Sequence, residues 1–169
     1  MLKYREIRID DIGEFWRFMN RLDQETRFMM YEPGERKKRV TEEELGEDIR
    51  NCVIEGEDFL KLAVEGEKIV GYLRAERGRY NRIRHTAYLV VGILEKYRGL
   101  GIGTALFQYL DQWAKEEGIV RLELTVEICN QAAKHLYEKN GFEVEGIRRK
   151  SMYVKGQYMD EYYMAKILS

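Results

Sequence analysis

The sequence has little proline, little cysteine and no excess of charge of either sign. Pro33 is the only proline among 169 residues, and no tract rich in glycine and serine marks a linker. Cys52 and Cys129 show no metal-ligand spacing and cannot form a disulfide framework. Because a domain commonly holds about 100–200 residues, we expect a single domain over residues 1–169.

The charges nearly cancel, with 29 basic and 30 acidic residues and a net charge of −1. A dedicated nucleic-acid binder would need a basic surface for the phosphates. No apolar run approaches the roughly 18 residues that span a bilayer, and residues 1–6 carry no apolar export signal. We therefore expect a cytoplasmic protein that binds neither nucleic acid nor membrane. A hydrophobic content of 44% is enough for a substantial core.

Hydrophobic periodicity predicts an α/β fold. Thr41 with Glu44 forms a capping box that opens the second helix, and Gly66-Glu67 turns a hairpin. Period-two or continuously apolar segments predict strands over residues 3–9, 60–64, 69–75, 85–93, 122–126, 142–154 and 157–167. Helical spacing predicts helices over residues 12–22, 41–53, 102–113 and 132–137. Their order favours a mixed sheet with a parallel pair in the middle and hairpins at the edges.

The most informative segment is the glycine-rich stretch of residues 97–104, between a buried strand and an amphipathic helix. Glycines at alternate positions free the backbone amides, and a helix N-terminus attracts phosphate. A simple linking turn explains the glycines equally well. The segment lacks the Gly-Lys-Ser/Thr of a P-loop, and Thr104 stands where the dinucleotide fingerprint needs glycine.

Two motifs carry a family resemblance. Arg98-x-x-Gly101-x-Gly103 resembles the pyrophosphate-binding signature of the GCN5-related N-acetyltransferases (GNAT). The block from Asn130 to Phe142, which contains Leu-Tyr-Glu-Lys-x-Gly-Phe, is similar to the family's second motif. The resemblance implies the GNAT fold, with a mixed and mostly antiparallel sheet and a central, splayed parallel pair flanked by helices. It also implies acetyl-CoA as co-substrate, no metal, and acetyl transfer to a primary amine by direct attack.

The same resemblance implies roles for individual residues. The pantetheine arm would pair with Val91, Gly92 and Ile93, and Asn130 and Lys134 would also contact the coenzyme. The pyrophosphate would be bound by Arg98, Gly99, Leu100, Gly101, Ile102, Gly103 and Thr104. Several of these residues have ordinary structural explanations: Gly92 can be a strand glycine, Asn130 a helix N-cap, and Lys134 an exposed lysine.

Tyr137 matches the family position for the group that protonates the departing thiolate. It also lies on the apolar helix face and can be a core residue. The base that deprotonates the amine stays open among His85, Glu32, Glu35 and Glu123, and a water chain would need none of them. An acyl-enzyme on Cys129 is disfavoured because no activating partner is visible.

The acceptor is expected to contact residues 24–40 and 150–160 by resemblance, with Tyr31, Glu32, Glu35 and His85 as its binding residues. We expect a small, amino-acid-like or otherwise unspecified amine. The alternatives are a polyamine of the spermidine type, which the acidic residues could attract, and a protein N-terminus or lysine. A non-enzymatic coenzyme A sensor is a further alternative. A homodimer or higher homo-oligomer is expected because dimers are frequent in this fold.

Overall fold

The computed structural model describes residues 1–168, which form seven strands and five α-helices. The strands are β1 (Leu2–Glu6), β2 (Phe59–Glu65), β3 (Lys68–Arg77), β4 (Thr86–Ile93), β5 (Arg121–Glu127), β6 (Glu143–Val154) and β7 (Gln157–Ile167). The helices are α1 (Ile12–Glu25), α2 (Glu35–Arg39), α3 (Glu42–Asp48), α4 (Ile102–Glu116) and α5 (Gln131–Lys139). No helix among these residues is both long enough and apolar enough to span a membrane.

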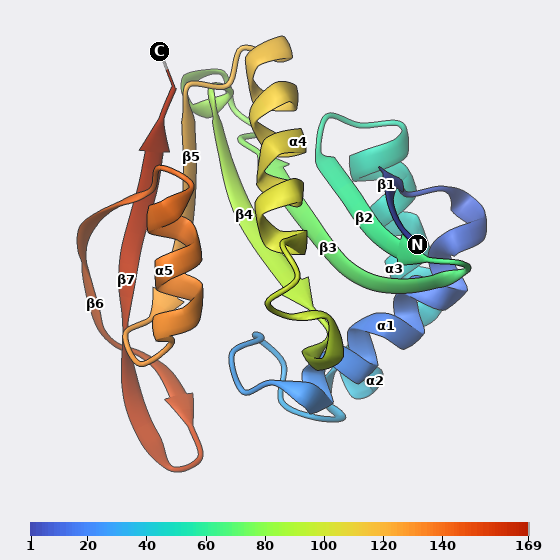
Figure 1. Ribbon diagram of the computed structural model, residues 1–169, viewed down its shortest axis with the longest axis horizontal. Helices are drawn as coiled ribbons and strands as arrows, with labels where there is room; N and C mark the ends of the chain where they lie inside the picture. The colour runs from blue at the N-terminus through green and yellow to red at the C-terminus, as the bar shows by residue number, and fades with distance from the viewer. Residues whose placement is uncertain (169) are drawn as a thin grey trace. The chain divides into compact units, whose positions relative to one another are not determined.

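The strands follow the order β1-β2-β3-β4-β5-β7-β6 (Figure 1). The pairs β1–β2, β2–β3, β5–β7 and β6–β7 are antiparallel. β4 and β5 are parallel, with Thr86–Tyr88 opposite Arg121–Glu123. The predicted α/β fold, with a mixed sheet and a central parallel pair flanked by helices, is therefore confirmed. The chain divides into two compact units, which are described separately below, and the expected single domain stays a prediction.

The first unit contains Met1–Glu76 and Val90–Leu110. Its core forms where α1 buries one apolar face against β3: the rings of Phe15 and Phe18 meet Tyr72 edge-on, at centroid distances of 5.5 and 5.7 Å. This geometry suits aromatic pairs because the positive ring edge faces a negative ring face. The helical spacing of apolar residues between 12 and 22 thus predicted the correct face of α1.

The second unit contains Arg77–Leu89 and Asp111–Ser169. Along β5 the alternate residues Leu122, Leu124 and Val126 are buried, which is the period-two pattern of a strand with one face in a core. β6 and β7 form the long C-terminal hairpin predicted from the sequence, with its turn at Lys155-Gly156 (Figure 1).

Three predictions about local structure were wrong. Residues 35–39 form the short helix α2, although a loop was expected there. The helix that opens at Thr41, whose side chain accepts from the Glu44 N–H as predicted, ends at Asp48 and continues as a π-helical segment, Ile49–Ile54. Burial along β4 alternates instead of being continuous, and His85 lies just before the strand. Periodicity does not resolve these features because each depends on a partner distant in the sequence.

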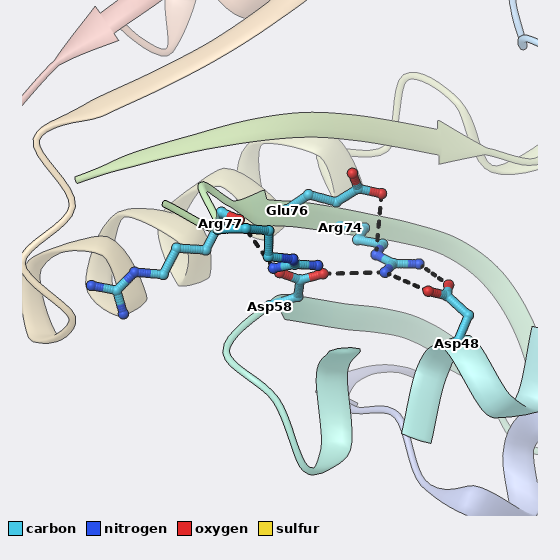
Figure 2. A network of polar contacts seen from close by, with 6 residues as sticks. Asp48, Asp58, Arg74, Glu76 and Arg77 are labelled. Carbon is cyan, nitrogen blue, oxygen red and sulfur yellow. Dashed lines mark hydrogen bonds and ion pairs between the residues drawn. The ribbon is translucent and has the colours of Figure 1, made fainter. Parts of the chain in front are cut away.

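A charged network in the first unit joins α3 to β3 (Figure 2). The Arg74 guanidinium donates to the Asp48 carboxylate at 2.6 and 3.3 Å and to the Asp58 carboxylate at 3.2 Å. Its Nε atom also lies 3.7 Å from Oε1 of Glu76. Burial opposes ionisation of Asp48, but the hydrogen bonds and charge of Arg74 outweigh it and hold the pKa of Asp48 below its usual value. The network therefore stabilises the fold only while Asp48 is ionised.

We predict that Asp48→Asn lowers the free energy of unfolding by about 1 kcal/mol at pH 7, since one partly exposed charge-assisted pair is weakened. A carboxyl group whose pKa is lowered by folding stabilises the protein above its unfolded pKa of about 3.9, and this contribution is lost as the pH falls through the folded value. The difference from wild type in urea unfolding should therefore shrink as the pH is lowered below about 3.9. Glu67→Gln, in the exposed β2–β3 turn, is the control; a deficit that persists at low pH would contradict the prediction.

Candidate functional site

The glycine-rich loop lies in the first unit, between a 3₁₀ turn at Glu95–Tyr97 and the start of α4. Gly99 and Gly101 have left-handed φ angles of +74° and +84°, which side chains rarely adopt. A Cβ at either glycine would meet no atom within 4 Å, so the space in front of the loop is open. The glycines are therefore needed for the conformation of the loop, and not because the chain is crowded there.

The start of α4 presents backbone amides that the helix itself does not use. The first hydrogen bond of the helix runs from the Ala105 N–H to the Gly101 carbonyl at 3.0 Å. The N–H groups of Ile102, Gly103 and Thr104 precede it, and the first N–H groups of any helix lack an intrahelical acceptor. Donors at a helix N-terminus, together with its partial positive charge, bind phosphate well. This arrangement fits the pyrophosphate of coenzyme A.

Several hydrogen bonds hold the segment that leads into the loop. The Leu94 N–H donates to the Val70 carbonyl at 2.9 Å, and the Glu95 N–H donates to the Glu25 carboxylate at 2.8 Å. Burial alone would raise the pKa of Glu25. The hydrogen bonds from the Glu95 N–H and from Arg21 lower it by more, so the pKa lies below its usual value. Arg98 turns back and donates through Nε to the Ile93 carbonyl at 3.1 Å. The loop is thus fixed to both α1 and β3.

The three residues predicted to meet the pantetheine arm end β4, in the same unit as the loop. Val91 and Ile93 are half-buried, and Gly92 is buried. A Cβ at Gly92 would come within 2.4 Å of Leu22 Cδ2 and 3.0 Å of Tyr72 Cε1. A side chain at residue 92 would therefore displace Leu22 of α1 and crowd Tyr72 of β3, which is an explanation for Gly92 that the sequence did not suggest. The pantetheine role of these residues stays a prediction.

The other predicted coenzyme residues belong to α5, in the second unit. Asn130 is the N-cap of α5, and its Oδ1 accepts from the Ala133 N–H at 3.3 Å. This confirms the structural explanation of Asn130 and is compatible with a further contact to a ligand. The Lys134 ammonium lies 3.6 Å from Glu138 and 5.0 Å from the centroid of the Tyr162 ring. Both contacts compete with its predicted role at the coenzyme phosphates.

Tyr137 is 8% exposed and packs its ring against Phe142, with 6.2 Å between the ring centroids. Burial raises the pKa of the Tyr137 phenol, and Tyr88 raises it further. The phenol is therefore protonated throughout the neutral range. A protonated phenol is what a donor to a thiolate must be, so a buried position and a proton-donating role are compatible.

The predicted acceptor residues are divided between the units. Tyr31, Glu32 and Glu35 belong to the first unit, where the Glu35 carboxylate accepts from the Glu32 N–H at 3.0 Å and from Arg39 Nε at 2.6 Å. These hydrogen bonds lower the pKa of Glu35. His85 belongs to the second unit and is exposed, and its carbonyl accepts from the N–H of Val120 at 2.8 Å.

Two polar features near the predicted residues were missed. In the first unit, Arg36 forms a buried ion pair with Asp23 and packs on Tyr31. In the second unit, the hydroxyl groups of Tyr88 and Thr125 are hydrogen-bonded at 2.8 Å, on the neighbouring strands β4 and β5. The predicted strand positions could have revealed the second pair, whereas no sequence pattern links Asp23 with Arg36.

Other groups considered as catalysts are engaged differently. Glu123, a candidate base, is bound by Arg121 Nε at 2.5 Å. Cys129 is exposed, with its sulfur 4.0 Å from Glu127 Oε1. Among residues 1–168, no three His, Cys, Asp or Glu side chains form a group that could hold a metal ion.

Comparisons with known proteins identify the family of this chain. The model of the acetyltransferase (GNAT) family matches residues 16–142. L-amino acid N-acetyltransferase AaaT of Escherichia coli (strain K12) is 31% identical over 112 residues, which cover 64% of this chain and 67% of that protein.

Solved structures of the same fold extend over nearly the whole chain. An acetyltransferase of the GNAT family from Streptococcus pneumoniae has a TM-score of 0.93 and 32% identity, and the match covers 99% of this chain and 100% of that one. YncA from Salmonella typhimurium, solved with its cofactor acetyl-CoA, has a TM-score of 0.85 at 18% identity, covering 99% and 94% of the two chains. The chain therefore belongs to the GNAT family of acetyltransferases and is an acyltransferase.

Proposed function

We propose that this acetyltransferase uses acetyl-CoA to acetylate the primary amine of a small, amino-acid-like molecule by direct attack. The observation that carries the proposal is the glycine loop, with its left-handed glycines, open space and three unused amides at the start of α4. The named relative that acts on L-amino acids supports the choice of acceptor.

The loop supplies binding energy remote from the reacting atoms. The amides of Ile102, Gly103 and Thr104 hold the pyrophosphate, while Gly99 and Gly101 allow the backbone to approach it. Arg98 adds a positive charge whose direction is fixed by its hydrogen bond to the Ile93 carbonyl. Binding energy of this kind positions the distant reactive end for attack.

Acetyl-CoA supplies an activated acyl thioester. A backbone N–H at the end of β4, from Val91 or Ile93, would stabilise the negative charge that develops on the carbonyl oxygen, which is commonly the largest catalytic term. As the C–N bond forms and the C–S bond breaks, Tyr137, whose phenol burial keeps protonated, would give its proton to the departing sulfur, and the proton lost by the amine nitrogen would return through water to restore the phenol.

The acceptor is proposed to bind at Tyr31, Glu32 and Glu35 of the first unit. A polyamine is less well supported by the described contacts. Glu35, one of the acids expected to attract it, is already neutralised by Arg39. An amine with a single positive charge needs only one free carboxylate, and Glu32 is exposed.

The proposal is tested by the release of free thiol from acetyl-CoA with a panel of amines. The panel contains L-amino acids, spermidine and a peptide with a free N-terminus, with acetylated amino acids as blocked controls. Turnover with amino acids and not with the blocked forms is expected. A protein that binds acetyl-CoA and releases no thiol with any amine would instead be a coenzyme sensor.

We predict that Gly101→Ala raises KM for acetyl-CoA roughly fivefold, equivalent to about 1 kcal/mol of lost binding energy. Alanine resists the left-handed conformation, so the loop shifts its amides. Gly66→Ala is a matched control, since Gly66 also has a positive φ (+62°) and open space but lies in the β2–β3 turn. Steady-state kinetics measure the effect, and equal KM values for both variants would refute the role of the loop.

Tyr137→Phe should lower kcat at least tenfold, since general acid catalysis typically contributes roughly 10²–10⁴-fold. KM for acetyl-CoA should stay within about twofold, because the hydroxyl acts on the leaving sulfur and not on binding. Tyr80→Phe, at an exposed tyrosine before β4, is the control. An unchanged kcat would show that Tyr137 serves only as a core residue.

A further inference from the structure

Residues 26–34, here called the acceptor segment, connect α1 to α2 in the first unit. A buried ion pair joins the two helices on either side of this segment. Asp23, near the end of α1, has a side chain that is 1% exposed, and the side chain of Arg36 in α2 is 10% exposed. Arg36 donates from Nε and Nη2 to the two oxygens of Asp23, at 2.7 and 3.1 Å. A paired guanidinium with two hydrogen bonds has a fixed plane.

Tyr31, within the acceptor segment, packs on that plane. The guanidinium carbon of Arg36 lies 4.6 Å from the centroid of the Tyr31 ring, well within the range of a cation–π contact. Because Asp23 fixes the guanidinium, the orientation of Tyr31 depends on a residue in α1. A lysine could not replace Arg36 here, since an ammonium group offers no flat surface and no two-pronged pairing.

The carboxylate of Glu35, just beyond the segment, also has local partners. Glu35 binds the Glu32 N–H and Arg39, which stabilises the turn before α2. The apolar side chain of Met30, by contrast, is 72% exposed. The segment is therefore anchored by the Asp23–Arg36 ion pair and carries an exposed apolar side chain. A binding surface for a small molecule would combine these two features.

We propose that Arg36, held by Asp23, is a positioning residue that orients Tyr31 for binding of the acceptor amine. The inference rests on the proposed function, because it assigns acceptor binding to the segment. It adds a buried pair that touches neither substrate and yet determines the affinity for one of them.

The test must separate positioning from folding. Removing one partner leaves an uncompensated buried charge, which strongly destabilises a protein, whereas replacing both partners with apolar residues is often neutral. The informative variant is therefore the double substitution Asp23→Leu/Arg36→Met. It should raise KM for the amine at least fivefold, while KM for acetyl-CoA, kcat and the unfolding midpoint stay close to wild type. Lys3→Met, which removes an exposed cation from β1 of the same unit, should change none of these.

A second variant makes the result specific to Tyr31. Tyr31→Leu should raise KM for the amine by a similar factor, and adding it to the double substitution should produce no further increase, because both changes remove the same oriented ring. An unchanged KM in the folded double variant, or increases that multiply in the combined variant, would overturn the proposal.

Hydrogen exchange provides a readout that does not require turnover. Amides of residues 26–34 should exchange faster in the double variant than in wild type, whereas the Lys3→Met control should exchange at the wild-type rate. Unchanged exchange in the double variant would overturn the positioning role. If the wild-type protein acetylated no amine, the proposed function would fail instead, and the exchange rates would still decide whether Arg36 orders the segment.

Discussion

Backbone amides at the start of α4 can bind an anion only if no group of the chain satisfies them first. Two features of the sequence meet this condition. The left-handed Gly99 and Gly101 turn the chain into the helix without a side chain in front of it. Bonds from Leu94, Glu95 and Arg98 to the surrounding backbone and to Glu25 keep the approach to the loop in place. A flexible loop would have to be ordered when the ligand binds, and this cost would lower the affinity.

Burial has opposite consequences for the two kinds of polar group in the protein. For Tyr137, burial keeps the phenol protonated and thereby maintains a proton donor. For Asp48, burial would favour the neutral acid, but the hydrogen bonds and charge of Arg74 outweigh it and lower the pKa of the carboxyl group. The difference is that a guanidinium offsets burial at the Asp48 carboxylate, whereas burial is the largest influence on the Tyr137 phenol and favours its neutral form.

Sequence reasoning predicted most of the fold because most elements carry their own signal. The alternation along β5, the turn at Gly66-Glu67 and the Thr41 cap are local patterns, and all of them were found. α2 was missed because its five residues are all charged and have no apolar period. Its Arg36 is buried against a residue 13 positions earlier, and local patterns do not report such a contact.

In the candidate site, too, features with a local sequence signal were predicted, and features that depend on distant residues were missed. The glycines of the loop were predicted because positive φ angles restrict the residue type directly. The reason for Gly92 was not visible, since it depends on the approach of Leu22 from α1. Counting charges along residues 24–40 also misrepresents the field that an acceptor meets, because Arg36 and Arg39 are each paired with a carboxylate. The unpaired charges that remain after folding are the reason we propose, for the acceptor segment, a substrate with one cationic group and an apolar part over a chain of several cations.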